Sequence, residues 1–516
     1  MLLDGLRLTG FCAASKLFFA ASQKAFTGFR ELGENFNAPR ATSRIQLDRK
    51  LDFMTNQIVR RSYLRFSLCL LLALLIPSQA AAQTFPEPVR EHLLNGLTVL
   101  LWQRPGDAKV LLKLRIHAGA AFDLTGKGGT MALLDDALFP DPSTGLYVRE
   151  QLGGQFELAT NHDSIDVTLS GTASEFERMV ELLRGALVTT QLTPENVANI
   201  RAARVDKLRE QPASPGQIAD QAIAARMFGG FPYGHPSAGT IESLSKVERA
   251  DLLFARERFL IASNATLVVA GPIEKARAMR AIRQLLGPWA KGDRVVPATF
   301  RQPDPPDARA LVVNQPGATT AEIRLAVRGL RRSDGDAAAV ALLGRIARER
   351  WQATTPDLSS VFARHEAHAL PGIFVLGASA PTPSASKAIA AAREVMRSLS
   401  TAAPALAEIE RARNAELSEL SQRTMQTESI ADRWLDIETF KLSLSGDQMD
   451  AVRRLSAADL QRVAARLFKD ASVATVVVGN YDQLKAGLGP TVELRSEKSD
   501  VKGATDPAAP AKAKKP

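Results

Sequence analysis

Residues 250–271, ADLLFARERFLIASNATLVVAG, decide the fold, because a closely similar stretch follows 208 residues later. Residues 458–479 read ADLQRVAARLFKDASVATVVVG, and seven of the 22 aligned positions are identical without a gap. Both stretches predict a helix, a short loop, an apolar strand and a glycine. A constant offset that is also a sensible domain length indicates an internal duplication rather than two unrelated helix–strand units.

The sequence outside this pair of stretches also repeats. Residues 91–102 and 110–116 predict two strands, and the second alternates apolar with basic residues. Residues 311–313 and 323–327 resemble this opening strand pair, and residues 337–350 resemble the helix that follows it. We therefore expect an α+β fold of two homologous domains, each an antiparallel-rich sheet with helices packed on one face.

Composition places the expected boundaries in a chain of 516 residues with 45% apolar and 23% charged residues. We expect a non-native or disordered extension at 1–53, a signal peptide at 54–82, a first domain at 87–290, a linker rich in proline at 291–307, a second domain at 308–490 and a disordered tail at 491–516.

The net charge of +10 does not indicate nucleic-acid binding. Residues 1–82 contain 11 Lys/Arg and 5 Asp/Glu, a surplus of 6, which leaves 10 − 6 = +4 for the rest of the chain. A body so close to neutrality does not attract phosphates strongly. We expect no nucleic-acid partner.

An export signal is predicted before residue 83. A basic segment, an apolar run at residues 66–77 and three alanines at 80–82 follow one another, in the order typical of a secretory signal peptide. The run is shorter than the roughly 20 residues of a membrane span, although an N-terminal anchor helix is the alternative. We expect an exported chain, in the periplasm or outside the cell, that begins near Gln83 and has no membrane span.

The signal lies unusually far from Met1, so we expect translation to start at Met54, with Met1 as the alternative. Both cysteines, Cys12 and Cys69, precede the expected mature chain. The body would then need no disulfide framework.

Several short motifs occur in a characteristic order: NGLTV at 95–99, HAGA at 117–120, Gly-Gly at 153–154 and PYGHP at 232–236. In this order they resemble the N-terminal domain of the pitrilysin/insulinase family of zinc peptidases, and the resemblance covers residues 87–490. It implies a half-clamshell of two paired domains. It also implies an inverted zinc motif, His-x-x-Glu-His, in the first domain.

The zinc motif is degenerate in this chain. In the family the motif is followed by Leu-Phe, and aligning that pair with residues 138–139 places Ala132, Asp135 and Asp136 at the first ligand, general base and second ligand positions. The third ligand, a Glu on a later helix, falls at or beside Lys207. We therefore predict no catalytic and no metal-binding residue among these four degenerate zinc-site positions.

The chemistry supports this prediction. A catalytic zinc needs three protein ligands and an open water position, and two of the ligands lie at i and i+4 on one helix face. Ala132 has no ligand atom, Asp136 is shorter than a histidine, and Lys207 is a cation. We expect no cofactor in this chain and zinc only in a partner subunit. The family's substrate-binding Arg and Tyr are also in doubt, because no Tyr follows the arginines of 343–351 until Tyr481.

Two other patterns have less specific interpretations. His365-Glu366-Ala367-His368 has i, i+3 spacing and is interpreted as a polar stretch of helix or loop. The pair Asp135-Asp136 could bind a hard cation, although such pairs are more often solvated or hydrogen-bonded.

The resemblance therefore implies a non-catalytic homologue that binds extended peptide and supports a zinc-bearing subunit of the same family. One alternative is a stand-alone binding or scaffold protein of the cell envelope. The other is an active metallopeptidase with an unorthodox metal site.

Overall fold

The computed structural model describes residues 85–293, 300–443, 448–488 and 492–496. All of them belong to one compact unit, Thr84–Pro516. The extension expected at 1–53, the signal peptide expected at 54–82, the middle of the linker and most of the expected tail lie outside the described residues.

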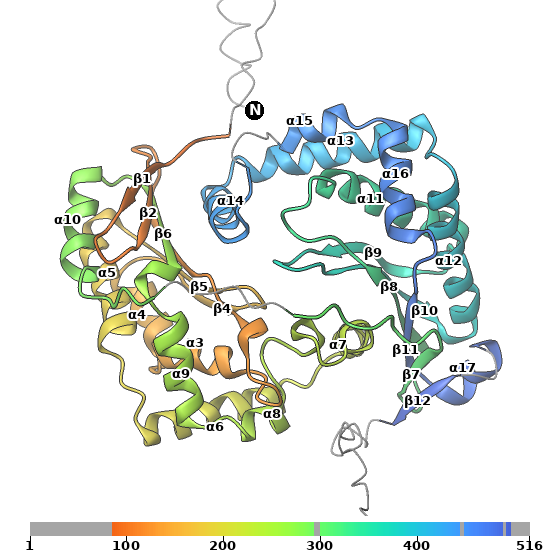
Figure 1. Cartoon of the computed structure of the whole chain (residues 1–516), viewed down its shortest axis with the longest axis horizontal. Helices are drawn as coiled ribbons and strands as arrows, with labels where there is room; N and C mark the ends of the chain where they lie inside the picture. Colours follow the sequence, from red (N-terminus) through yellow and green to blue (C-terminus); the bar gives the residue numbers. More distant parts are fainter. Residues whose placement is uncertain (1–84, 294–299, 444–447, 489–491, 497–516) are drawn as a thin grey trace, which may run out of the picture. The chain divides into compact units, whose positions relative to one another are not determined.

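Two six-stranded sheets form the fold (Figure 1). The first has the order β1-β2-β6-β3-β5-β4, and the second has the order β12-β7-β11-β8-β10-β9. The strands of the first sheet are β1 (Val89–His92), β2 (Thr98–Gln103), β3 (Val110–Ile116), β4 (Phe156–Thr160), β5 (Ile165–Gly171) and β6 (Ala265–Gly271). Those of the second are β7 (Ala310–Asn314), β8 (Thr320–Arg328), β9 (Ser359–Glu366), β10 (Ile373–Pro381), β11 (Ala474–Gly479) and β12 (Glu493–Ser496).

The helices of the first half are α3 (Thr130–Leu138), α4 (Thr144–Gln151), α5 (Phe176–Arg184), α6 (Pro194–Glu210), α7 (Pro215–Phe228), α8 (Ile241–Ser245), α9 (Arg249–Phe259) and α10 (Lys275–Leu286). Those of the second half are α11 (Ala337–Thr354), α12 (Ala385–Thr401), α13 (Leu406–Arg423), α14 (Thr427–Phe440), α15 (Gln448–Arg454), α16 (Ala457–Phe468) and α17 (Tyr481–Leu488).

Five strands of each sheet follow the same path. β2 pairs in parallel with β6, and β7 pairs in parallel with β11, while β6-β3-β5-β4 and β11-β8-β10-β9 are antiparallel throughout. The first residues of α9 and α16, at 249 and 457, are 208 positions apart. The structure thus confirms the α+β fold with two sheets and the repeated unit predicted from the sequence.

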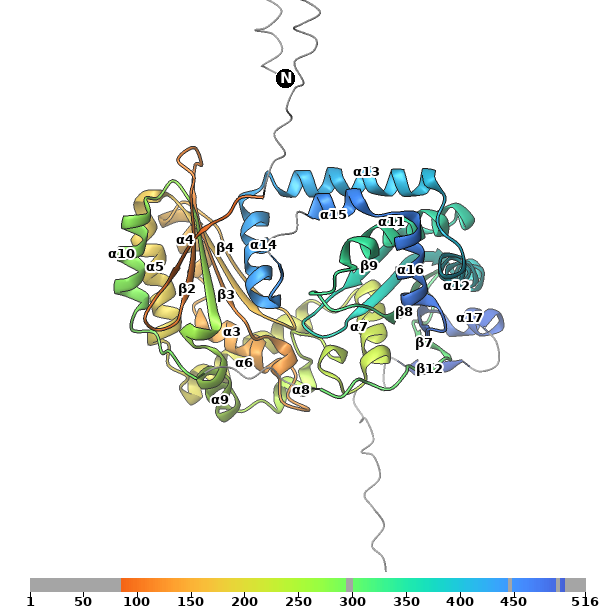
Figure 2. The same cartoon turned by 45° about the horizontal axis from the view of Figure 1, so that its top comes forward.

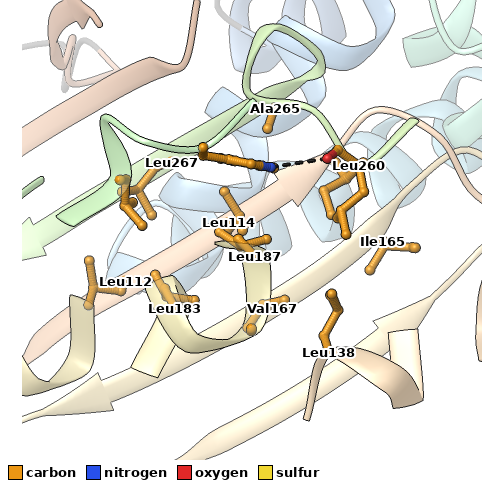
Figure 3. Packing of buried hydrophobic residues seen from close by; sticks show 14 of the residues in the cluster. Leu112, Leu114, Leu138, Ile165, Val167, Leu183, Leu187, Leu260, Ala265 and Leu267 are labelled. Atoms are coloured by element: carbon orange, nitrogen blue, oxygen red, sulfur yellow. Dashed lines mark hydrogen bonds between the residues drawn. The ribbon is translucent and has the colours of Figure 1, made fainter. Parts of the chain in front are cut away.

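Each sheet has one face in its own hydrophobic core. In β3, Val110, Leu112, Leu114 and Ile116 are fully buried in the first core, as the alternation of apolar residues predicts. Figure 3 shows Leu112 and Leu114 among the side chains packed in this core. The equivalent face of β8 packs in a separate core with α11, α12 and α16. Burial of such side chains stabilises the fold by about 1.5–3 kcal/mol each relative to exposure.

The opposite face of each sheet is covered by a helix from the other half. Trp434 and Leu435 of α14 pack on Leu100 and Val268 of the first sheet, opposite α5 and α10 (Figure 2). In the same way, α7 of the first half packs on β8 and β11 of the second sheet. The two halves therefore exchange equivalent helices, which explains why apolar residues such as Leu100 and Val268 are buried on the second face of a sheet as well.

An equivalent ion pair joins each exchanged helix to its sheet. Lys113 of β3 lies 2.7 Å from Asp432 of α14, and Arg324 of β8 lies 2.6 Å from Asp220 of α7. Both basic residues are buried, so each requires its acidic partner. The pairing registers Lys113–Val268 and Arg324–Val476 place the two bases at equivalent positions, since Val268 and Val476 are 208 residues apart.

Two expectations need correction. The expected disordered tail at 491–516 contains β12 at residues 493–496, because these residues pair in parallel with β7 and complete the open edge of the second sheet. His365 and Glu366 lie at the end of strand β9, not in a helix or loop, because they pair with β10. Within the described part of the chain, no helix is both long and apolar enough to cross a membrane.

Candidate functional site

The degenerate zinc motif lies on α3, a helix that is almost wholly buried. Gly129 precedes it with φ +92°, and a Cβ there would lie 2.8 Å from Leu244, so the tight entry requires glycine. Asp123 accepts hydrogen bonds from the backbone N–H groups of Gly129 and Met131 at 2.7 and 2.8 Å. A carboxyl at this helix start satisfies donors that would otherwise lack partners.

Ala132 and Asp136 lie one turn apart on the same face of α3, as the i, i+4 spacing predicts. This face is directed at α6, the helix expected to supply the third ligand position. α6 begins at Pro194 after the N-cap Thr193, whose hydroxyl accepts from the N–H of Asn196.

Arg204 of α6 forms hydrogen bonds and an ion pair with this face. Its Nε donates to Asp136 Oδ2 at 2.6 Å, and its Nη2 donates to Asp136 Oδ1 at 2.9 Å and to the carbonyl of Ala132 at 3.1 Å. Lys207 is exposed and has no side-chain partner among the described residues. The structure therefore places Arg204, and not Lys207, opposite the two positions on α3.

The sequence does not indicate Arg204, because the alignment that places the third ligand position at or beside Lys207 rests on Leu208 and Pro215. The buried positions of α6 are Val197 and Ile200, and two helical turns after them lie Arg204 and Lys207 respectively, so the helical repeat alone does not distinguish the two residues. Only the packing of α6 on α3 selects Arg204.

The residues at these positions do not fit zinc. Ala132 offers no side-chain ligand, both carboxylate oxygens of Asp136 accept hydrogen bonds from Arg204, and a guanidinium carries a fixed positive charge. Across the described residues, no group of three or more His, Cys, Asp or Glu side chains is arranged to bind a metal ion. The positive charge between α3 and α6 is therefore the guanidinium of Arg204 and not a metal ion.

Asp135, at the general-base position, is turned away from Arg204 and buried with 3% exposure. Its Oδ2 accepts from the hydroxyl of Thr160 at 2.8 Å, while its Oδ1 has no hydrogen-bond partner among the described residues. Burial raises the pKa of Asp135 to about 7, and the nearby charge of Asp136 adds to the effect, although Thr160 opposes it. The Asp135-Asp136 pair is therefore one buried carboxyl and one ion-paired carboxylate.

Thr160 ends β4, the edge strand of the first sheet, so the α3 site adjoins a free sheet edge. Backbone hydrogen bonds from Ser170 to Gln155 and from Asn161 to Ser164 set the phase of the β4–β5 ladder. Gln155 and Asn161 therefore belong to hydrogen-bonded pairs with β5. Because bonded and non-bonded pairs alternate along an antiparallel ladder, the N–H groups of Phe156, Leu158 and Thr160 belong to non-bonded pairs and point away from β5. No described strand pairs with this side of β4, so it can accept an extended peptide.

The other residues singled out in the sequence have structural partners. His365 Nε2 accepts from the N–H of Leu330 at 2.9 Å, and burial lowers its pKa to about 4. His368 Nδ1 lies 2.8 Å from Asp163 in the turn between β4 and β5. Arg345 and Arg350 form ion pairs with glutamates of α13, whereas Arg348 is exposed. The HEAH stretch and two of the three arginines thus join elements of the fold.

Comparisons with known proteins agree with this architecture. Residues 246–416 match a family model described as the Peptidase M16 inactive domain. An uncharacterized zinc protease of Rickettsia felis is 19% identical over 207 residues, which is 39% of this chain and 50% of that protein. Human cytochrome b-c1 complex subunit 1, mitochondrial, is 22% identical over 224 residues, which is 42% of this chain and 46% of that protein.

The chain thus spans about half the length of the curated relatives that it matches. Among solved structures, a protease from Helicobacter pylori superposes with a TM-score of 0.69 at 16% identity, covering 77% of this chain and 100% of that one.

The repeated sheets and the superposition define a two-domain fold of the M16 peptidase type. Residues 246–416 match the inactive domain of the M16, or insulinase, family, and this match supports a relationship of the chain to that family. The resemblance drawn from the sequence motifs is confirmed at this level.

Proposed function

We propose that this chain is a non-catalytic M16 homologue that binds extended peptide along β4 and supports a zinc-bearing subunit of the same family. The observation that carries this proposal is the guanidinium of Arg204 between α3 and α6, paired with Asp136 and bonded to Ala132. A fixed cation at this position excludes a second cation by charge repulsion. The feature beside this cation that can bind a peptide is the free edge of β4.

A supporting role also suits the relatives. Human cytochrome b-c1 complex subunit 1 is named as a subunit of an assembly, and this chain shares sequence with it. We propose export to the periplasm on the basis of the apolar run at 66–77 and the alanines at 80–82. A mature N-terminus near Gln83, read by mass spectrometry, tests the export; tryptic peptides from residues 1–50 would contradict the start at Met54.

The decisive experiment compares the zinc content and peptidase activity of this chain with those of its proposed partner. The tagged chain is purified from the exporting cell, and zinc content and cleavage of a mixed peptide library are measured for the complex and for each subunit alone. We expect zinc and activity in the partner, higher activity in the complex, and neither in this chain. Stoichiometric zinc with chelator-sensitive cleavage by this chain alone would establish the active-peptidase alternative, and recovery without any M16 peptidase would favour the scaffold.

The β4 edge has its own test. Leu158→Pro removes an N–H that points away from β5 and leaves the ladder with β5 intact, because residues 157 and 159 supply the bonds to β5. Leu158→Ala is the matched control, since it shortens the same side chain but keeps the N–H. We expect the proline variant to lose binding of fluorescein-labelled peptides from an unfolded-protein digest, and the alanine variant to retain it. Equal binding by both variants would exclude strand addition at β4.

A further inference from the structure

A cavity of about 470 Å³ lies where the end of β8, the end of α16 and the linker between the two halves meet. Its walls are apolar and basic: Leu330, Met227 and four prolines line it together with Arg328, Arg466 and Lys469. None of the described residues that line it is acidic. The cavity thus combines an apolar wall with positive charge.

Arg328 is the central feature of this cavity. Its Nη1 is buried without a hydrogen-bond partner, and the side chain makes no ion pair with any residue that the structure describes. Its guanidinium lies 5.1 Å from the ring centre of Phe228, which orients it by a cation–π contact. Burial lowers the pKa of Arg328, as expected for a cation taken partly out of water without a counter-charge.

In the first half, the residue at the position equivalent to Arg328 has hydrogen-bond partners for its polar atoms. Lys113 of β3 pairs with Val268, and Arg324 of β8 pairs with Val476, 208 residues later. His117 and Arg328 each lie four residues after these equivalent positions, so they are counterparts. Both ring nitrogens of His117 have partners, Thr266 and, on the exchanged helix α14, Thr439, each at 3.0 Å.

The exchanged helix offers no such partner in the second half. The residue of α7 that corresponds to Thr439 is Met227, since α7 and α14 start at residues 215 and 427 and both positions lie 12 residues further on. A thioether is only a weak acceptor. Arg328 therefore has N–H donors without a partner beside this cavity, whereas both ring nitrogens of its counterpart His117 are hydrogen-bonded.

The other two basic groups at this cavity differ in whether they have acidic partners. Arg466 is already paired with Asp334 and Asp336 at 2.9 and 2.8 Å. Lys469 has no acidic partner among the described residues, and it lies at the end of α16, where it opposes the partial negative charge of the helix C-terminus. Two basic groups, Arg328 and Lys469, thus remain available to an anion.

We propose that this cavity binds a carboxylate attached to a short apolar body, with Arg328 donating to the carboxylate and the prolines packing on the apolar part. The C-terminal residue of a peptide and a free N-acylated amino acid both have this chemistry. A planar guanidinium matches a carboxylate in geometry, and an aliphatic substituent can pack against the prolines that line the cavity. The proposal does not depend on peptide binding at β4, which lies in the other sheet.

The test uses the full exported chain and two probes, N-acetyl-leucine and N-acetyl-leucinamide, by isothermal titration calorimetry. We expect saturable binding of the acid and at least about tenfold weaker binding of the amide, because a charge-assisted hydrogen bond is lost. A peptide ending in a free Leu and its amidated form distinguish the two sources of the carboxylate. Equal affinity for acid and amide would overturn the proposal.

The matched variants are Arg328→Gln and Arg301→Gln. Both remove one positive charge, but Arg301 lies on the linker with 92% of its side chain exposed and outside the lining of this cavity. We expect loss of acid binding only in Arg328→Gln, with partial recovery in Arg328→Lys and with an unchanged or higher melting temperature. Undiminished binding by Arg328→Gln would also overturn the proposal, and if that variant folds poorly, the acid–amide comparison on the unaltered chain decides.

Discussion

Arg204 of α6 and Asp136 of α3 form a two-point ion pair, with Nε–Oδ2 and Nη2–Oδ1 distances of 2.6 and 2.9 Å. The same guanidinium bonds the carbonyl of Ala132, so one side chain spans both positions at which the family motif places histidines. The pair therefore joins α3 to α6 without a metal. Two consequences of this pair can be measured.

The first prediction concerns the strength of this link. Arg204→Gln should lower the free energy of unfolding by about 1–3 kcal/mol, because Asp136 and the Ala132 carbonyl lose a charged donor in a partly buried place. Asp136→Asn should cost a similar amount, and the double variant should cost clearly less than the sum. Arg209→Gln on the same helix is the control, since its ion pair with Asp206 is exposed. Additive costs in urea titrations would show that the two residues do not interact.

The second prediction restores a zinc site. Ala132→His, Asp136→His and Arg204→Glu together supply two imidazoles at i, i+4 and a carboxylate from the helix residue that reaches them. We expect this triple variant to bind zinc stoichiometrically by metal analysis after dialysis. The matched control replaces Lys207 by Glu and leaves Arg204 in place, and we expect it to bind none. Equal zinc in both variants would show that Arg204 does not mark the third position.

The third prediction follows from the pKa of Asp135. A carboxyl with a pKa near 3.8 when unfolded and about 7 when folded keeps its proton in the folded chain between these values. Its contribution to stability is therefore full below pH 4 and lost as the pH rises to 7. Asp135→Asn removes this dependence, so its stability relative to the unaltered chain should rise by about 2–3 kcal/mol between pH 5 and pH 8. Buried histidines do not affect the comparison, because both chains contain them.

A stability difference that is the same at pH 5 and at pH 8 would contradict this account of Asp135. Thr160→Val is an informative second variant, because it removes the hydroxyl that donates to the carboxylate and should raise the pKa of Asp135 further.

The fourth prediction concerns Asp163, which connects the turn after β4 with the loop after β9. Its carboxylate contacts His368 Nδ1 at 2.8 Å and accepts from the N–H of Ala369 at 3.2 Å and the hydroxyl of Tyr233 at 3.3 Å. Asp163→Ala leaves these buried groups without an acceptor and should cost about 2–4 kcal/mol. Asp163→Asn keeps one acceptor oxygen and should cost less. Thermal unfolding monitored by circular dichroism measures both, and equal melting temperatures for the two variants would exclude the acceptor role.

Much of the fold was predictable because its signals are local or periodic. The alternation in β3 and the helical stripe of α5 follow from side chains facing one core, so composition along the chain reveals them. The strand β12 was missed because four residues in a charged, alanine-rich segment carry little local signal. They become a strand only through pairing with β7.

The candidate site was predictable only in part. Ala132, Asp135 and Asp136 follow from the motif on one short helix, where spacing along the chain determines which residues share a face. Arg204 lies 68 residues beyond Asp136, and its contact depends on how α6 packs on α3. The sequence alignment therefore placed the third ligand position at or beside Lys207, three residues after Arg204 on the same helix.

The sequence by itself determined the duplication, the two-sheet fold and the loss of the histidines, because each follows from the identity and spacing of residues along the chain. Only the tertiary structure decided what took their place. The exchange of α7 and α14 between the halves, the cation between α3 and α6, and the unpaired Arg328 all join residues that are distant in the chain. Such contacts depend on packing geometry, and packing geometry is not local in sequence.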